Sequence, residues 1–175
     1  VDEAARAELK ISRGEFLVVM DYAPGQTLSA WRRGFSERRV PLAEALEVCT
    51  HVGAALDYAH AQRIVHRDIK PSNVMVSGAA GSLSVQVLDF GLAAEIRSSM
   101  SRVSRDTGDT SGTRPYMAPE QWAGKRQGPA TDQYALAVLF HELITGSVPF
   151  ASAFETNDPL VMMNAAPEPD GRSGP

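Results

Sequence analysis

Two short polar stretches hold the residue types that could carry out chemistry. The first reads His-Arg-Asp-Ile-Lys-Pro-Ser-Asn over residues 66–73, and the second reads Asp-Phe-Gly over residues 89–91. A carboxylate can orient a hydroxyl group and accept its proton, and a nearby lysine can neutralise negative charge. Carboxylate and amide oxygens are also the ligands that magnesium prefers. The two stretches therefore suit chemistry at a charged group in the presence of a hard cation.

The elements expected before and between these stretches begin with a strand. The apolar run at residues 16–20 predicts this strand, and Pro24 and Gly25 then force a turn. Residues 27–39 predict a short basic helix. Pro41 starts a second helix whose apolar stripe has helical spacing. The stripe consists of Leu42, Leu46, Cys49, Val52, Leu56 and Ala59.

Two short strands are expected next, at Val74–Val76 and at Val85–Leu88, joined by a glycine-rich turn. The polar stretch 98–112 has no hydrophobic period and predicts a long loop, of the kind that is usually functional or disordered. Residues 132–145 predict a helix that is apolar nearly all round and closed by Gly146. Such a helix belongs in the middle of a core, and the fold class is α+β.

The order and spacing of three motifs resemble the protein-kinase family, specifically the bacterial type of Ser/Thr kinase. Asn73 lies five positions after Asp68, and Asp89 lies twenty-one positions after Asp68. Residues 112–120 then read Gly-Thr-Arg-Pro-Tyr-Met-Ala-Pro-Glu. In the family these motifs are the catalytic loop, the metal-binding Asp-Phe-Gly and the end of the activation segment. One triplet alone is a weak signal, whereas the joint match, over about residues 11–163, is specific.

The resemblance implies a protein-kinase-like fold, with a mostly helical C-terminal lobe and short β-hairpins. It also implies transfer of the ATP γ-phosphoryl group to Ser or Thr hydroxyls of protein substrates. Asp68 would accept the hydroxyl proton, and Lys70 would place positive charge on the transferred group. Asn73 and Asp89 would bind Mg²⁺. Thr113 would hydrogen-bond the catalytic aspartate and lysine from the activation segment.

For the nucleotide, the resemblance implies four positions. Met20 would be the gatekeeper at the end of the small lobe. The carbonyl of Asp21 and the amide of Ala23 would bind the adenine edge, and Met75 would form the apolar floor beneath the base. Backbone contacts of this kind leave almost no side-chain signature, and a methionine on a strand is more often plain core.

Other motif residues are expected to be structural. His66 and Phe90, the latter followed by Gly91, resemble members of the hydrophobic stack that aligns an active kinase. Asp132 resembles the buried aspartate that holds the catalytic-loop backbone, although a carboxylate there also suits the helix dipole. Glu120 usually pairs with an arginine from a later helix, and Arg172 is the one arginine after Phe150 in this sequence.

Regulation is expected to involve Arg67, which precedes the catalytic aspartate and in the family pairs with a phosphate on the activation loop. The acceptor is left open among Ser104, Thr107, Thr110 and Ser111, with Thr107 or Thr110 favoured.

The sequence departs from the family at both ends. No glycine-rich loop, strand lysine or partner glutamate is found in the nineteen residues before Met20. We therefore expect residues 1–22 to be a remnant of the small lobe and hinge, with most of the N-terminal β lobe absent. Residues 23–164 would be a partial large lobe and residues 165–175 a flexible tail. As an isolated chain it would be inactive.

Composition limits the partners and the compartment. The net charge of -4 gives no reason to expect nucleic-acid binding, and no apolar run is long enough to span a membrane. A single cysteine, Cys49, suits a reducing compartment. We expect a cytoplasmic kinase domain, in a parent protein that could be membrane-anchored, and a possible kinase dimer for trans-phosphorylation.

Two alternatives of other classes remain. A pseudokinase or binding scaffold would use the fold without turnover, but it would not need all of Asp68, Lys70, Asn73 and Asp89. A small-molecule phosphotransferase would lack the lysine after the catalytic aspartate and the segment that ends in Ala-Pro-Glu.

Overall fold

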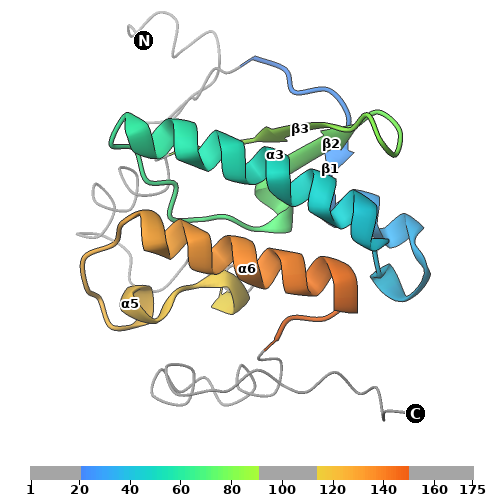
Figure 1. Cartoon of the computed structure of the whole chain (residues 1–175). Helices are drawn as coiled ribbons and strands as arrows, with labels where there is room; N and C mark the ends of the chain where they lie inside the picture. Colours follow the sequence, from blue (N-terminus) through green and yellow to red (C-terminus); the bar gives the residue numbers. More distant parts are fainter. Residues whose placement is uncertain (1–20, 91–113, 150–175) are drawn as a thin grey trace, which may run out of the picture.

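The computed structural model describes residues 21–90 and 114–149 (Figure 1). In chain order the elements are β1 (Gln26–Thr27), α2 (Leu28–Trp31), the 3₁₀ turns η1 (Arg32–Gly34) and η2 (Ser36–Arg38), α3 (Leu42–Ala61), η3 (Pro71–Asn73), β2 (Val74–Ser77), β3 (Ser84–Val87), η4 (Arg114–Tyr116), α5 (Pro119–Trp122) and α6 (Pro129–Thr145). In these two ranges, no helix combines the length and the apolar character needed to cross a membrane.

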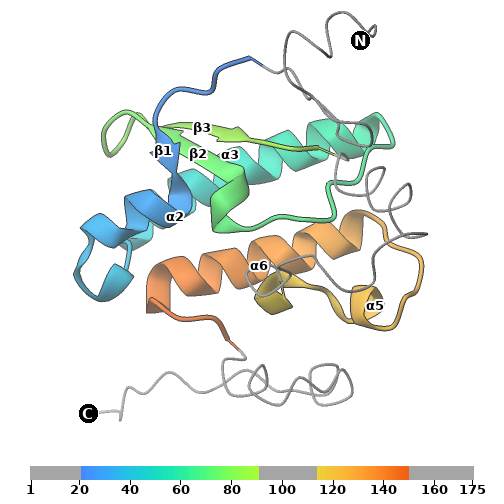
Figure 2. The same ribbon diagram turned by 180° about the vertical axis from the view of Figure 1, so that it is seen from behind.

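The two long helices and a small sheet form layers, with α3 between the sheet and α6. The helices α3 and α6 lie side by side and run in opposite directions (Figures 1 and 2). The sheet is antiparallel in the order β1-β2-β3, with Met75 opposite Thr27 on one side and Gln86 on the other. Val48 and Val52 of α3 and Leu139 and Leu143 of α6 are fully buried. Burying each such side chain contributes about 1.5–3 kcal/mol.

The apolar face of α3 differs from the predicted stripe. Leu42 and Leu46 are 59% and 49% exposed, so the first part of the predicted stripe does not face the core. The buried positions are instead Ala45, Val48, Val52, Leu56 and Ala59. Both sets have helical spacing, and they share the positions from Val52 onward, in the second half of the helix. Which of two such faces is buried is decided by the neighbouring elements, because only one can contact α6 and β3.

The predicted basic helix over residues 27–39 is present only in part. The helix α2 ends at Trp31, and two 3₁₀ turns follow it. Helical geometry is interrupted at Glu37 and Arg38, which have left-handed φ values of 51° and 58°. After this turn the chain is hydrogen-bonded to α6, because the main-chain N–H of Val40 donates to the carbonyl of Leu143 at 2.7 Å.

The remaining predicted elements are confirmed with shifted ends. The strand expected at 85–88 is β3 at 84–87, and α6 begins at Pro129, three residues before the expected start. Gly146 closes α6 with a left-handed φ of 85°. The turn between β2 and β3 is fixed to α3 by Glu47, whose carboxylate accepts the amides of Gly81 at 3.0 Å and Leu83 at 2.7 Å. The strand expected at residues 16–20, the polar loop at 98–112 and the expected tail lie outside the described residues.

Candidate active site

One buried carboxylate fixes the loop of residues 66–73 to the start of α6. Asp132 is fully buried in the first turn of α6. Its Oδ2 accepts the main-chain N–H of His66 at 2.9 Å, and its Oδ1 accepts that of Arg67 at 2.7 Å. Because Arg67 has a left-handed φ of 68°, the loop adopts a conformation that costs energy and needs such support.

The His66 ring connects this loop to the segment that carries the second motif. Its Nε2 lies 2.7 Å from the carbonyl of Leu88, and its Nδ1 accepts the amide of Asp68 at 3.2 Å. A carbonyl oxygen can only accept, so Nε2 carries the proton and the ring is neutral. The ring also meets Phe90 edge-on, with 4.9 Å between centroids. The buried His66 ring therefore connects the first motif, to which it belongs, with the second.

The Asp68 carboxylate has two unequal oxygens. Oδ2 lies 3.0 Å from the ammonium nitrogen of Lys70 and accepts the side-chain amide of Asn73 at 3.1 Å. Within the described residues, the buried Oδ1 has no hydrogen-bond partner. A buried carboxylate oxygen costs free energy when it is left without a donor. The arrangement therefore leaves one oxygen ready to accept a proton or a hydroxyl group from outside the chain.

Asn73 is fixed by its own backbone and by the loop. Its amide donates to the carbonyl of Lys70 at 2.9 Å, and its carbonyl accepts the amide of Leu88 at 2.8 Å. The side-chain Nδ2 also donates to the main-chain oxygen of Asp68 at 2.8 Å. These contacts use the side-chain nitrogen, so Oδ1 remains as a ligand atom. Among the described residues it accepts one long hydrogen bond, from the Ser72 hydroxyl at 3.4 Å.

The oxygen donors fit magnesium bound together with a substrate. Asp89 is exposed and has a left-handed φ of 62°, directly after the strand β3 and Leu88. In the two described ranges, no group of three or more His, Cys, Asp or Glu side chains could hold a metal. Asp89 and Asn73 thus offer a carboxylate and an amide oxygen, and magnesium usually takes its other ligands from water and substrate phosphates.

The positions expected to contact adenine are only partly described. Asp21 is exposed and Ala23 half-buried in a segment without regular structure. Met75 is half-buried on β2, on the sheet face opposite the buried Val74 and Val76. The expected residues Met20, Gly91, Thr107, Thr110 and Thr113 lie outside the described residues, as do the alternative acceptors Ser104 and Ser111.

Arg67 and Glu120 differ in how they are partnered. The Arg67 side chain is exposed, and within the described residues no acidic group pairs with it. Glu120 is half-buried, and its carboxylate accepts the hydroxyl of Thr131 at 2.5 Å. That hydroxyl in turn accepts the amide of Gly128 at 3.1 Å. Glu120 is therefore neither fully buried nor without a partner, and this contact links α5 to the start of α6.

Several residues of this region were not singled out from the sequence. His60, at the end of α3, has its Nε2 2.7 Å from Oδ2 of Asp132. Glu142 on α6 pairs with Arg32 at 2.5 Å and accepts the hydroxyl of Tyr116. A glutamate in a helix that is otherwise apolar nearly all round was the available signal, because a buried charge requires a partner.

Burial and the charge of Glu142 raise the pKa of Tyr116 far above its usual range. The phenol is therefore neutral at any physiological pH. It keeps its proton and donates a hydrogen bond to the carboxylate of Glu142.

Comparison with known proteins connects the whole arrangement to one family. A family model described as the protein kinase domain matches residues 7–167. The probable serine/threonine-protein kinase PknB of Lactococcus lactis is 37% identical over 144 residues, which cover 78% of this chain and 21% of that protein. Serine/threonine-protein kinase PknF of Mycobacterium tuberculosis is 36% identical over 141 residues, 80% of this chain and 29% of that protein.

Solved structures give the same result for the fold. The crystal structure of the Mycobacterium tuberculosis PknI kinase domain is 28% identical and superposes with a TM-score of 0.57. The match covers 86% of this chain and 48% of that structure. The chain thus spans about half of the solved domain and less than a third of the curated relatives.

Proposed function

Because this chain belongs to the protein kinase domain family, we propose that the whole protein transfers the γ-phosphoryl group of ATP to Ser or Thr hydroxyls of other proteins. Protein kinases in general use ATP and magnesium. The relatives named above are serine/threonine-protein kinases, which supports hydroxyl groups of proteins as the acceptors.

The observation that carries the proposal is the unequal environment of the two Asp68 carboxylate oxygens. Lys70 and Asn73 hold Oδ2, whereas Oδ1 has no hydrogen-bond partner within the described residues. A substrate hydroxyl that donates to Oδ1 would be oriented for attack and would find a base for its proton. A structural loop carboxylate would be expected to have both oxygens satisfied.

In the proposed step, the acceptor hydroxyl attacks the terminal phosphate of ATP. The hydroxyl oxygen bonds to the γ-phosphorus while the bond from that phosphorus to the bridging β–γ oxygen breaks, and ADP leaves. The hydroxyl proton passes to Asp68. The Lys70 ammonium, held at 3.0 Å from Asp68, supplies positive charge beside the transferred group. Bound magnesium, with Asn73 Oδ1 and Asp89 as ligands, would neutralise phosphate charge.

Further assignments belong to the same proposal. Met20 would be the gatekeeper, the main chain of Asp21 and Ala23 would bind the adenine edge, and Met75 would lie against the base. Thr113 would contact Asp68 and Lys70, and a phosphate at Thr107 or Thr110 would pair with Arg67. We place the kinase domain in the cytoplasm and propose trans-phosphorylation between two copies.

The test compares the full-length protein with its Asp68→Asn variant. Transfer from radiolabelled ATP to Ser, Thr and Tyr peptides is measured with magnesium present. We expect transfer to Ser and Thr, and a loss on the order of 10²–10⁴-fold in kcat for the variant, since the base is removed. Lys125→Ala, an exposed lysine away from the loop, serves as the control and should keep its activity. A folded wild-type protein that binds ATP without transfer would establish a scaffold instead.

A further inference from the structure

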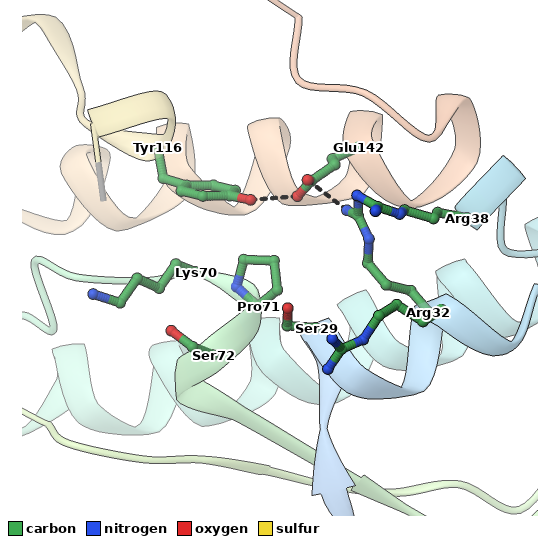
Figure 3. Close-up of a pocket in the computed structure, with 9 residues that line it drawn as sticks. Ser29, Arg32, Arg38, Lys70, Pro71, Ser72, Tyr116 and Glu142 are labelled. Atoms are coloured by element: carbon green, nitrogen blue, oxygen red, sulfur yellow. Dashed lines mark hydrogen bonds and ion pairs between the residues drawn. The ribbon is translucent and has the colours of Figure 1, made fainter. Parts of the chain in front are cut away.

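A cavity of about 330 Å³ opens beside the catalytic loop, and four of its nine lining residues are cationic (Figure 3). Arg32, Arg33 and Arg38 line it from the turns after α2, and Lys70 lines it from the loop. Glu142 is the one carboxylate among its lining residues. Because Lys70 also contacts Asp68, the cavity adjoins the proposed reaction site.

The single carboxylate is not available to a ligand. Arg32 pairs with one oxygen of Glu142 at 2.5 Å, and the Tyr116 hydroxyl donates to the other. The side chains of Arg32 and Glu142 are only 7% and 10% exposed. Figure 3 shows this chain of contacts from Tyr116 through Glu142 to Arg32. A cationic group that entered the cavity would find the carboxylate already neutralised.

The arginines after α2 divide into two groups. Arg32 and Arg39 are used within the fold, because they donate to the carbonyls of Gly146 at 3.4 Å and Thr145 at 3.1 Å, at the end of α6. Arg33 and Arg38 are exposed, and neither forms an ion pair with any described residue. The cavity therefore has two guanidinium groups whose donors are free for a ligand.

The backbone keeps Arg38 in place. Glu37 and Arg38 both have left-handed φ values, which cost energy for residues other than glycine. The turn is held in this conformation because Gly146 packs against the carbonyl of Glu37 and Val40 bonds to α6. In Figure 3 the Arg38 side chain extends toward Glu142 and Arg32. A guanidinium placed by a fixed turn loses less entropy on binding an anion.

From this charge arrangement we propose that the cavity binds an anionic side chain of the substrate peptide, near the residue that is phosphorylated. Guanidinium groups bind carboxylates and phosphoryl groups through charge-assisted, often bidentate hydrogen bonds. The hydroxyl of Ser29, which also lines the cavity, adds a further donor. The inference rests on the proposed kinase function, because it concerns the peptide that would place its hydroxyl at Asp68. Arg33 and Arg38 are then specificity-determining residues.

The test measures binding separately from turnover. Fluorescent peptides carry one Ser acceptor in a neutral background, and each other position in turn is Ala, Asp, phosphoserine or Arg. Their affinity for this chain is measured by fluorescence anisotropy at low and high salt. At one or two neighbouring positions, we expect the anionic residues to bind about three- to tenfold more tightly than Ala. Arg should bind no better than Ala, and the gain should disappear at about 1 M salt.

Matched variants identify the residues responsible. The double variant Arg33→Gln and Arg38→Gln should lose the preference while keeping its melting temperature, because both side chains are exposed. Lys125→Ala removes one exposed charge outside the cavity and should keep the preference. Equal or absent binding of the Asp, phosphoserine and Ala peptides, or a preference that survives in the double variant, would overturn the inference. A gain with phosphoserine alone assigns the cavity to phosphoryl groups, and a gain with both assigns it to carboxylates as well.

Turnover by the full-length protein separates the two proposals. If transfer occurs without any charge preference in binding, the inference fails and the kinase function stands. If the anionic peptides bind through Arg33 and Arg38 but no peptide is phosphorylated, the anion site stands and the proposed function fails.

Discussion

The buried carboxylate of Asp132 accepts the main-chain N–H of His66 at 2.9 Å, across 66 positions of sequence. The same carboxylate accepts the neighbouring amide of Arg67 and contacts Nε2 of His60. Each bond joins a charged acceptor to a donor that lies in or at the edge of the core. The loop that carries Asp68 is thus tied to the first turn of α6 and to the last turn of α3.

Replacing Asp132 should destabilise the fold and displace the loop. Asp132→Ala leaves two main-chain donors without their acceptor, and the buried charge-assisted network is lost. We expect the free energy of unfolding to fall by about 3–5 kcal/mol. Asp132→Asn keeps the shape of the side chain but turns its NH₂ group toward one of the two main-chain N–H donors. We therefore expect the free energy of unfolding to fall by about 2 kcal/mol. Urea unfolding measures both values.

Asp57→Asn is the control for this substitution. Asp57 is an exposed aspartate on α3, and its change should alter the free energy of unfolding by less than about 0.5 kcal/mol. A stability of Asp132→Ala equal to that of the control would contradict the structural role given to the buried carboxylate.

Spacing along the chain predicted that the side chains of the first motif lie together, but it predicted the core less well. The motif residues Asp68 and Asn73 lie five positions apart in one loop, so their proximity follows from local geometry. The face of α3 did not follow, because Leu42 and Leu46 fit a helical stripe as well as Ala45 and Val48 do. Contact with α6 and β3 determines which of the two faces is buried. The helical spacing of apolar residues in the sequence does not reveal that contact.

The ion pair of Arg32 with Glu142 could not be predicted in the same way. The two residues lie 110 positions apart, and the sequence between them gives no sign that they meet. Only the glutamate itself, in an apolar helix, indicated that some partner was required. The anion-binding cavity depends on this pair, so the charge of the cavity also became apparent only in three dimensions.

Breaking the Arg32–Glu142 pair from one side should be more harmful than removing it entirely. Glu142→Gln leaves the guanidinium of Arg32 buried without its counter-charge, and we expect a loss of about 3–5 kcal/mol in the free energy of unfolding. The double variant Arg32→Met with Glu142→Gln removes both charges and should recover part of that loss. Denaturant unfolding of the two single variants and the double variant gives the coupling energy. Additive losses would show that the pair contributes no coupling.

Gly146 should not tolerate a side chain, for two separable reasons. Its φ is 85°, and a Cβ added there would lie 2.4 Å from the carbonyl oxygen of Glu37. Gly124 has a similar φ of 62°, but nothing lies within 4 Å of its added Cβ. We expect Gly124→Ala to cost about 1 kcal/mol for the backbone alone. Gly146→Ala should cost at least about 2 kcal/mol more, because the turn of Glu37 and Arg38 must shift.

Thermal unfolding of the two glycine variants tests this difference. Equal melting temperatures for Gly146→Ala and Gly124→Ala would mean that the close approach to Glu37 has no cost. If the turn does move, the Gly146 variant should also lose part of the anionic peptide preference, since Arg38 belongs to that turn.

The thiol of Cys49 on α3 should react slowly in the folded protein. Burial raises its pKa from 9.0 to about 12, so at pH 8 the reactive thiolate is about a thousandfold rarer than in the unfolded chain. Because the pKa is raised by folding, the unfolded thiol ionises first as pH increases. The stability that the neutral thiol contributes is therefore complete below pH 9 and is lost progressively between pH 9 and about 12. Alkylation by iodoacetamide at pH 8, with and without denaturant, measures the first effect. Similar rates in the two conditions would show that the thiol is not protected by the fold.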